Sequence, residues 1–230
     1  MQQYFYADNL HVNEEILLSE DILFHLQKVL RKDHNYMFRI ADAQGKIFLA
    51  HLTDQKHALI EEELDEDNEL PQKITVILSL IKQDKFEWAI QKLTELGVSR
   101  IVPYIAERTQ IVPEGKKKWE RFRKILQEAA EQSHRNRIPE LCDPVKEKDL
   151  VHFLSDVNLL AYEKEDTKLT AVEIREGSVS LLIGPEGGFT ENETVRFKEL
   201  GFRSLSLGKR ILRAETAAVY LTSVVVEKMQ

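Results

Sequence analysis

The spacing of apolar residues in the first part of the chain predicts a small β unit that carries one helix. Short runs typical of strands stand at residues 2–6, 36–41, 46–52 and 58–63. A polar turn at residues 42–45 joins two of these runs as an antiparallel hairpin. A helix begins after Ser19, and its apolar face is expected to consist of Ile22, Leu26, Val29 and Leu30.

An acidic, polar segment at residues 65–72 marks a domain boundary, and the charge of the chain changes there. Residues 1–70 carry a net charge of −9, whereas residues 71–230 carry +2. The second part includes a basic run between Arg108 and Arg137. The overall charge of −7 argues against nucleic acid as a partner, but this distribution leaves room for a local nucleic-acid site. A solvated helix face is the alternative explanation of the basic run.

The pattern after this boundary predicts a parallel α/β domain. The continuous apolar run at residues 74–80 is typical of a strand that is buried on both faces. A strand at residues 101–105 follows, after a helix with buried positions at Phe86, Ala89, Ile90 and Leu93. Strand, helix and strand at this spacing indicate a βαβ unit. A helix at residues 116–133 and a strand at residues 157–162 continue the pattern.

Two glycine-containing loops in the last fifty residues form the candidate site. One begins at Gly184 and the other at Gly208, each after an apolar, strand-like run. Each loop leads into a helix, and Thr190 with Glu193 forms the capping-box pattern that opens the first of these helices. Glycine lets a backbone approach a ligand closely, and open α/β sheets bind ligands at the carboxyl ends of their strands. Two tight connections without a ligand are the other interpretation.

The composition is that of an ordinary soluble protein and disfavours several kinds of site. Hydrophobic residues make up 43% and charged residues 31%, and no apolar run or N-terminal pattern indicates a membrane span or a signal peptide. Because Cys142 is the only cysteine, we expect a cytoplasmic protein. The seven histidines lack metal-ligand spacing, so no metal site is expected. Phosphate-loop, dinucleotide and nucleophile-elbow motifs do not occur.

At the two loops the sequence closely resembles the bacterial 16S ribosomal RNA uridine-N3 methyltransferase family. The resemblance is carried by LLIGPEGGF at residues 181–189 and LSLGKRILRAETA at residues 205–217. Further matching blocks include HLQKVLR at residues 25–31 and EAAEQSHR at residues 128–135. Where the family usually has a Gly-Asp turn, this chain has His34-Asn35 instead, and Asn also tolerates the left-handed turn conformation.

This resemblance implies an α/β fold with two domains. Residues 71–230 would form a SPOUT-type methyltransferase domain with a trefoil knot, and residues 1–70 a PUA-like β-barrel with an RNA-binding role. The knot of such domains binds S-adenosyl-L-methionine. The residues implied in cofactor binding are Leu160, Tyr162, Glu163, Ile183, Gly184, Pro185, Glu186, Gly187, Gly188, Leu207, Gly208, Ile211, Leu212 and Arg213.

The resemblance also implies residues for RNA contact and for catalysis. The RNA-contact candidates are Arg31, Arg108, Gln132, Ser133 and Arg135. For Arg31, a cation favoured at a helix C-terminus is an equally good explanation. Uracil N3 carries a proton at neutral pH, so a base and a stabilising cation would lower the barrier to its methylation. Glu215 is the candidate base and Arg213 the candidate cation; both could instead support the knot, and we favour that for Glu215.

The leading hypothesis is an enzyme that methylates N3 of a uridine in 16S ribosomal RNA, with free RNA or the small ribosomal subunit as its partner. One alternative is a SPOUT ribose 2′-O-methyltransferase that acts on tRNA or rRNA. The N-terminal domain and the ILRAETA motif disfavour it. Another is a non-catalytic RNA-binding assembly factor, which the intact glycines of both loops disfavour. The resemblance further implies a homodimer, and the apolar segment 220–226 suits either its interface or the core.

Overall fold

The computed structural model describes residues 1–113, 115–165, 167 and 177–229, and these form two compact units. The first unit comprises Met1–Glu69 and Ala130–Arg137. The second comprises Leu70–Ala129 and the described residues from Ile138 onward. This division differs from the expected domains, 1–70 and 71–230, because residues 130–137 belong with the first unit.

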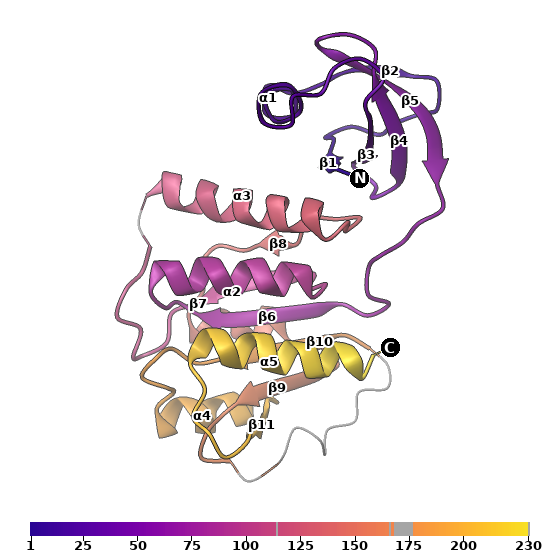
Figure 1. The fold of residues 1–230 in the computed structure, drawn as a ribbon. Coiled ribbons are helices and arrows are strands. Elements are labelled where there is room, and N and C mark those ends of the chain that lie inside the picture. Colours follow the sequence, from indigo (N-terminus) through magenta and orange to yellow (C-terminus); the bar gives the residue numbers. More distant parts are fainter. Residues whose placement is uncertain (114, 166, 168–176, 230) are drawn as a thin grey trace. The chain divides into compact units, whose positions relative to one another are not determined.

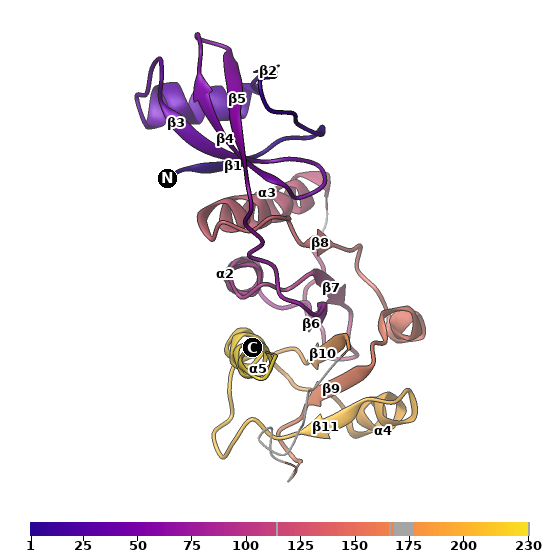
Figure 2. The ribbon, with the colours of Figure 1, turned by 90° about the vertical axis from the view of Figure 1, so that its right-hand side faces the viewer.

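A curled five-stranded sheet forms the first unit, with strand order β1-β3-β4-β5-β2. Its strands are β1 (Gln3–Phe5), β2 (Glu15–Leu17), β3 (Met37–Ala41), β4 (Ile47–Leu52) and β5 (His57–Leu64). β1 pairs with β3 in parallel, and the other neighbours are antiparallel. Because β1 and β2 stand at the two edges and do not pair with each other, the curled sheet stays open, as a half-barrel (Figure 2). Leu26, Phe38 and Phe48 are among the buried side chains of its core.

One helix packs on this sheet, and its geometry changes midway. It consists of α1 (Glu20–Phe24) and the π-helical turn η1 (His25–Val29). In the π-turn the Leu30 N–H donates to the His25 carbonyl, five residues back, at 2.9 Å. This wider turn shifts the face that the following residues present. Leu26 is therefore buried as predicted, but Val29 is 55% exposed, and its predicted place in the core is wrong.

A six-stranded sheet forms the second unit, with strand order β11-β9-β10-β6-β7-β8 (Figure 1). Its strands are β6 (Ile74–Ser79), β7 (Arg100–Tyr104), β8 (Glu140–Leu141), β9 (Val157–Ala161), β10 (Val179–Ile183) and β11 (Arg203–Leu205). Every neighbouring pair in this order is parallel. This confirms the predicted α/β class. The last strand ends at Leu205, shortly before Gly208, where the second glycine loop begins.

Helices cover both faces of this second sheet. They are α2 (Gln83–Glu95), α3 (Lys116–Gln132), the 3₁₀ helix η2 (Glu147–Phe153), α4 (Glu191–Glu199) and α5 (Ala214–Glu227). Figure 2 shows α2 and α5 on one side of the strands and α4 on the other. Alternate residues of β6 follow this arrangement: Val76 and Leu78 join the core under α2 and α5, whereas Ile77 joins the core that contains Phe197 of α4. Packing on both faces fixes the strand ends in place.

The strand order brings three loops together at one edge of the sheet. β9, β10 and β11 are neighbours. Because they run parallel, the loops that follow their carboxyl ends emerge at the same edge, where α/β sheets bind ligands. The trefoil knot implied by the family resemblance stays a prediction.

Candidate active site

The loops after β9, β10 and β11 enclose a cavity of about 280 Å³, which we call the loop cavity. It is lined by Ala161, Tyr162, Glu163, Ile183, Gly184, Pro185, Glu186, Gly187, Gly188, Phe189, Leu207, Gly208, Arg210, Ile211, Leu212, Ala214 and Ala217. Small-molecule sites typically have volumes from roughly 300 Å³ upwards, so the loop cavity is close to the lower limit. The two glycine loops predicted from the sequence thus meet around one space.

Glycine is required in the loop after β10 for two reasons. The Gly188 N–H donates to the Pro185 carbonyl at 2.9 Å, and this tight turn gives Gly188 a φ of +67°. A side chain at that φ is strained. At Gly184, a Cβ atom would lie 3.2 Å from the Phe189 ring, so a larger residue would displace that ring. The loop therefore presents main-chain atoms to the cavity.

Residues from two neighbouring strand ends hold this loop in position. The Arg108 guanidinium, after β7, donates from Nη1 to the Gly187 carbonyl at 2.8 Å. The Lys82 backbone N–H, after β6, donates to Glu186 Oε1 at 3.1 Å. Each anchor comes from a different segment of the chain, so the loop shape depends on β6 and β7 as well as on β10.

A fully buried carboxylate, Glu193, connects the loop to the start of α4. Its Oε2 accepts the Thr190 N–H at 2.8 Å, and Thr190 Oγ1 accepts the Glu193 N–H at 3.1 Å. This reciprocal pair confirms the predicted capping box. Glu193 Oε1 also accepts the Glu107 N–H at 2.9 Å, so the same carboxylate fastens the loop after β7 to α4.

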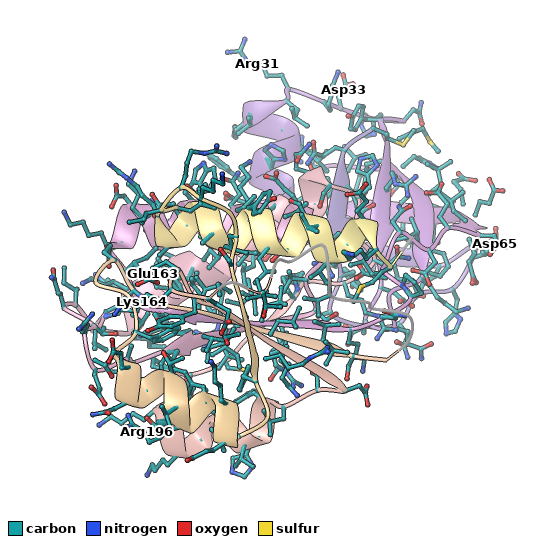
Figure 3. All side chains as sticks on the ribbon, turned by 90° about the horizontal axis from the view of Figure 1, so that it is seen from below. Arg31, Asp33, Asp65, Glu163, Lys164 and Arg196 are labelled. Atoms are coloured by element: carbon teal, nitrogen blue, oxygen red, sulfur yellow. The ribbon has the colours of Figure 1, made fainter. Side chains whose placement is uncertain are left out.

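An ion-pair network strengthens this connection. Arg196 of α4, labelled in Figure 3, lies 2.7 Å from Glu107 and 2.6 Å from Glu147. Hydrogen bonds from Arg196 and from the Thr190 hydroxyl to Glu107 hold the pKa of that carboxyl below its ordinary value. The two carboxylates raise the pKa of the Arg196 guanidinium in turn. The network locks α4 against the segment that carries Arg108.

The loop after β11 leads directly into α5 and leaves the start of that helix uncapped. Gly208 has a φ of +117°, and a Cβ atom there would meet nothing within 4 Å. Arg213 is the N-cap residue of α5 but forms no side-chain cap. Ala214 and Ala217 line the loop cavity, so the N–H groups of the first turn border it. N–H groups at the start of a helix attract anions.

Most residues that the resemblance implied in cofactor binding lie around this cavity. Of those fourteen, twelve line it. The exceptions are Leu160, which is fully buried in the core, and Arg213, which is exposed. Ala161, which lies between the implied residues Leu160 and Tyr162, also lines the cavity, and sequence reasoning missed four further lining residues: Phe189, Arg210, Ala214 and Ala217. Alanine and phenylalanine look like ordinary core residues in a sequence. Among the missed residues only Arg210 is charged, so its side chain was the one signal that could have indicated a binding role.

The two catalytic candidates are not brought into the cavity. Neither Arg213 nor Glu215 lines it. Glu215 is buried in the first turn of α5, where the helix dipole favours an acidic side chain. This position agrees with the structural role that we favoured for Glu215. Catalysis by either residue stays a prediction.

The five RNA-contact candidates lie in different environments. Arg31, Arg108 and Gln132 are exposed, and Ser133 is half-buried. Arg135 is only 3% exposed, and its guanidinium lies 2.5 Å from the Glu69 carboxylate within the first unit. A guanidinium that is buried and paired in this way offers no surface to RNA. Arg135 is therefore corrected to a structural residue of the first unit.

Among the described residues, no cluster of three or more His, Cys, Asp or Glu side chains is suited to a metal ion. Cys142 lies outside the loop cavity, and burial, together with nearby Glu140, raises the pKa of its thiol to about 11. The thiol is therefore protonated at neutral pH and is a poor nucleophile. No helix in the described ranges is long and apolar enough to cross a membrane.

Comparison with known proteins points to one family. Residues 68–226 match a family model described as an RNA methyltransferase domain. The ribosomal RNA small subunit methyltransferase E of Mesomycoplasma hyopneumoniae is 34% identical over 219 residues, which cover 91% of this chain and 95% of that protein. The Bacillus subtilis protein of the same name is also 34% identical, and the match covers 98% of this chain and 96% of that protein.

A solved structure extends this likeness to three dimensions. The ribosomal RNA small subunit methyltransferase E from Neisseria gonorrhoeae, bound to S-adenosyl methionine, matches this chain with a TM-score of 0.90 and 32% identity. The match covers 98% of this chain and 96% of that one. Sequence, domain model and fold agree, and the chain therefore belongs to the ribosomal RNA small subunit methyltransferase E family.

Proposed function

We propose that this chain transfers a methyl group from S-adenosylmethionine to N3 of a uridine in 16S ribosomal RNA. The observation that carries the proposal is the loop cavity, formed where a parallel sheet binds ligands. The chain that forms it matches a cofactor-bound relative over nearly its full length. The shared name of the curated relatives gives small-subunit ribosomal RNA as their substrate. Resemblance to the uridine-N3 family supplies the position of the methyl group.

The residues of the loop cavity fit S-adenosylmethionine. The uncapped first turn of α5 would hold the carboxylate of its methionine part. Leu207 and Leu212 supply apolar surface for the adenine, and the open space beside Gly208 leaves room for it. When bound, the cofactor supplies an electrophilic methyl group on a sulfonium centre. The protein's task is then to orient that group and to exclude water.

Exposed cations and exposed apolar residues support the proposed partners. Arg108 is exposed beside the glycine loop, and Arg31 is exposed in the first unit, so either can contact phosphates. A homodimer is also proposed. Ile211 is 87% exposed at the loop cavity, and Tyr220 is exposed on α5; a second copy of the chain would cover such apolar surface. Its ribosomal substrate implies a cytoplasmic location.

The test combines methyl transfer with cofactor binding. Small ribosomal subunits that lack their base methylations are incubated with the protein and labelled S-adenosylmethionine, and the digested RNA is analysed by mass spectrometry. Label in 3-methyluridine is expected. Gly208→Leu should weaken cofactor binding at least tenfold in calorimetry, because the new side chain would enter the loop cavity.

Gly201→Leu is the matched control for this substitution. Gly201 also has a positive φ, +100°, with nothing within 4 Å of a Cβ atom, but it does not line the cavity. Both variants therefore carry a similar backbone strain of roughly 1–2 kcal/mol, and only Gly208→Leu should lose the cofactor. Label on a ribose 2′-oxygen would replace the uridine-N3 methyltransferase hypothesis by the ribose 2′-O-methyltransferase hypothesis. Absence of both label and cofactor binding would favour the assembly factor.

A further inference from the structure

A second cavity of about 300 Å³ adjoins the loop cavity; we call it the outer cavity. It is lined by Arg108, Glu163, Lys164, Phe189, Thr190, Glu191 and Asn192. Glu163 and Phe189 line both cavities, so a molecule in the outer cavity would lie next to the bound cofactor. The outer cavity combines an apolar ring with charged and polar side chains, as small-molecule sites do.

Glu163 differs from the other carboxylates near these cavities. Glu186 accepts a hydrogen bond from the Lys82 N–H, and Glu191 pairs with Lys164 at 2.8 Å. Glu193 is occupied by the capping box. In the described part of the chain, Glu163 alone among these four forms no hydrogen bond and no ion pair. Its carboxylate is exposed at the end of β9, where Figure 3 labels it beside Lys164.

Positive charge also lines the outer cavity. Arg108 uses one N–H group to hold the Gly187 carbonyl at 2.8 Å. A guanidinium has five N–H donors, so further donors remain for a ligand in the cavity that Arg108 lines. An uncharged ring that carries carbonyl oxygens and one acidic N–H would find an acceptor in Glu163 and donors in Arg108.

We propose that the outer cavity takes the uracil of the target nucleotide, and that Glu163 accepts its N3 proton. The inference rests on the proposed methyl transfer. The bond from N3 to the methyl carbon forms while the bond from that carbon to sulfur breaks, and the sulfur keeps the electron pair of the broken bond. The N3 proton passes to a carboxylate oxygen of Glu163. The negative charge of Glu163 and the positive charge of the sulfonium are thus both lost, and the charges balance.

A carboxylate is basic enough for this role because the acidity of N3–H rises during the reaction. As the methyl carbon bonds to N3, positive charge develops on that nitrogen and its proton becomes strongly acidic. An acceptor already in place removes the proton in the same step. Arg108 would stabilise negative charge on the uracil carbonyl oxygens. The earlier candidates, Arg213 and Glu215, line neither cavity, and their catalytic roles stay predictions.

Glu163→Gln tests the proposal because it keeps the size of the side chain and removes the base. The rate of methyl transfer in a single turnover at pH 7 should fall by about 10²–10⁴-fold, the usual contribution of a general base. The affinity for S-adenosylmethionine, measured by calorimetry, should change less than threefold. Glu199→Gln is the control: it removes the same charge from an exposed position of α4 that lines neither cavity.

The pH dependence gives a second readout that a structural role would not change. Uracil that has already lost its N3 proton needs no base. Below the pKa of N3, the fraction of ionised uracil rises about tenfold per pH unit, so the methyl-transfer rate of Glu163→Gln should rise by the same factor. The wild-type rate should stay nearly level over this pH range. A loss of less than threefold, or parallel pH profiles, would overturn the proposal. If weaker binding of S-adenosylmethionine accounted for the whole loss of rate in Glu163→Gln, Glu163 would be a cofactor ligand and not the base. If the wild type transfers no methyl group to RNA, the proposed function itself fails, and this inference with it.

Discussion

Replacing Glu69 by Gln should destabilise the first unit strongly, because Glu69 neutralises a buried charge. Its Oε1 accepts hydrogen bonds from Arg135 Nε at 3.2 Å and from the backbone N–H groups of Asn136 and Arg137 at 3.0 and 3.1 Å. Its Oε2 accepts from Arg135 Nη2 at 2.5 Å. Only 4% of the Arg135 side chain is exposed, so water cannot replace the lost carboxylate.

The size of the effect follows from these contacts. Each hydrogen bond to a charged group contributes about 1.5–3 kcal/mol, but the four share one carboxylate and do not add. Breaking a buried ion pair by removing one partner costs about 3–5 kcal/mol, since the other charge stays buried without that partner. For a protein of 150–250 residues, 1 kcal/mol corresponds to about 2–4 °C, so the thermal midpoint should fall by about 6–20 °C.

Thermal unfolding followed by circular dichroism measures this shift. Glu62→Gln, on the exposed surface of the same unit, is the matched control and should change the free energy of unfolding by less than about 0.5 kcal/mol. The double variant Glu69→Leu/Arg135→Met should recover much of the loss, because it removes both buried charges. A thermal midpoint for Glu69→Gln within 2 °C of the wild-type value would refute this reasoning. Arg135 would then again be a candidate for RNA contact.

Two further predictions concern titrating groups outside the loop cavity. The pKa of Glu107 is lowered on folding by Arg196 and Thr190, so its stabilising effect is present above about pH 4.3, the ordinary glutamate pKa, and is lost as the pH falls through the lowered value. The thermal midpoint of Glu107→Gln should therefore lie below that of the wild type at pH 7, and the two should converge in acid; an equal gap at pH 3 would contradict this. The pKa of the Cys142 thiol is about 11, against about 8.5 for an exposed thiol, so at pH 8 it should react with a disulfide reagent on the order of 10²-fold more slowly in the folded protein than in urea. Equal rates would show that the thiol is not protected.

Local patterns predicted the elements whose stability depends on nearby residues. Phe86, Ala89, Ile90 and Leu93 are all fully buried, as the periodicity of α2 predicted. The capping box at Thr190 formed because its two partners are only three residues apart. Signals of this kind are visible in a sequence because the interacting groups stand within one helical turn.

Contacts between distant residues could not be predicted in this way. Arg135 looked like an exposed cation because its partner, Glu69, lies 66 positions earlier in the chain. On α4, the apolar Val195 is exposed, whereas the polar Glu193 is buried. Glu193 tolerates burial because a backbone N–H at Glu107, far away in the sequence, donates to it. In the candidate site, glycines revealed the loops, but no local signal distinguished the unpaired Glu163 from the engaged glutamates.

The return of residues 130–137 to the first unit has a consequence for how the chain folds during synthesis. Asn136 donates to the carbonyls of Gly45 and Glu66, and Gln3 donates to the carbonyl of Arg135. The N-terminal unit therefore lacks these partners until residue 137 has left the ribosome. At roughly 5–20 residues per second, translation of the intervening segment takes about 3–14 s. During that time the nascent N-terminal sheet exposes unpaired polar groups, and a chaperone or the ribosome surface has its best opportunity to bind it.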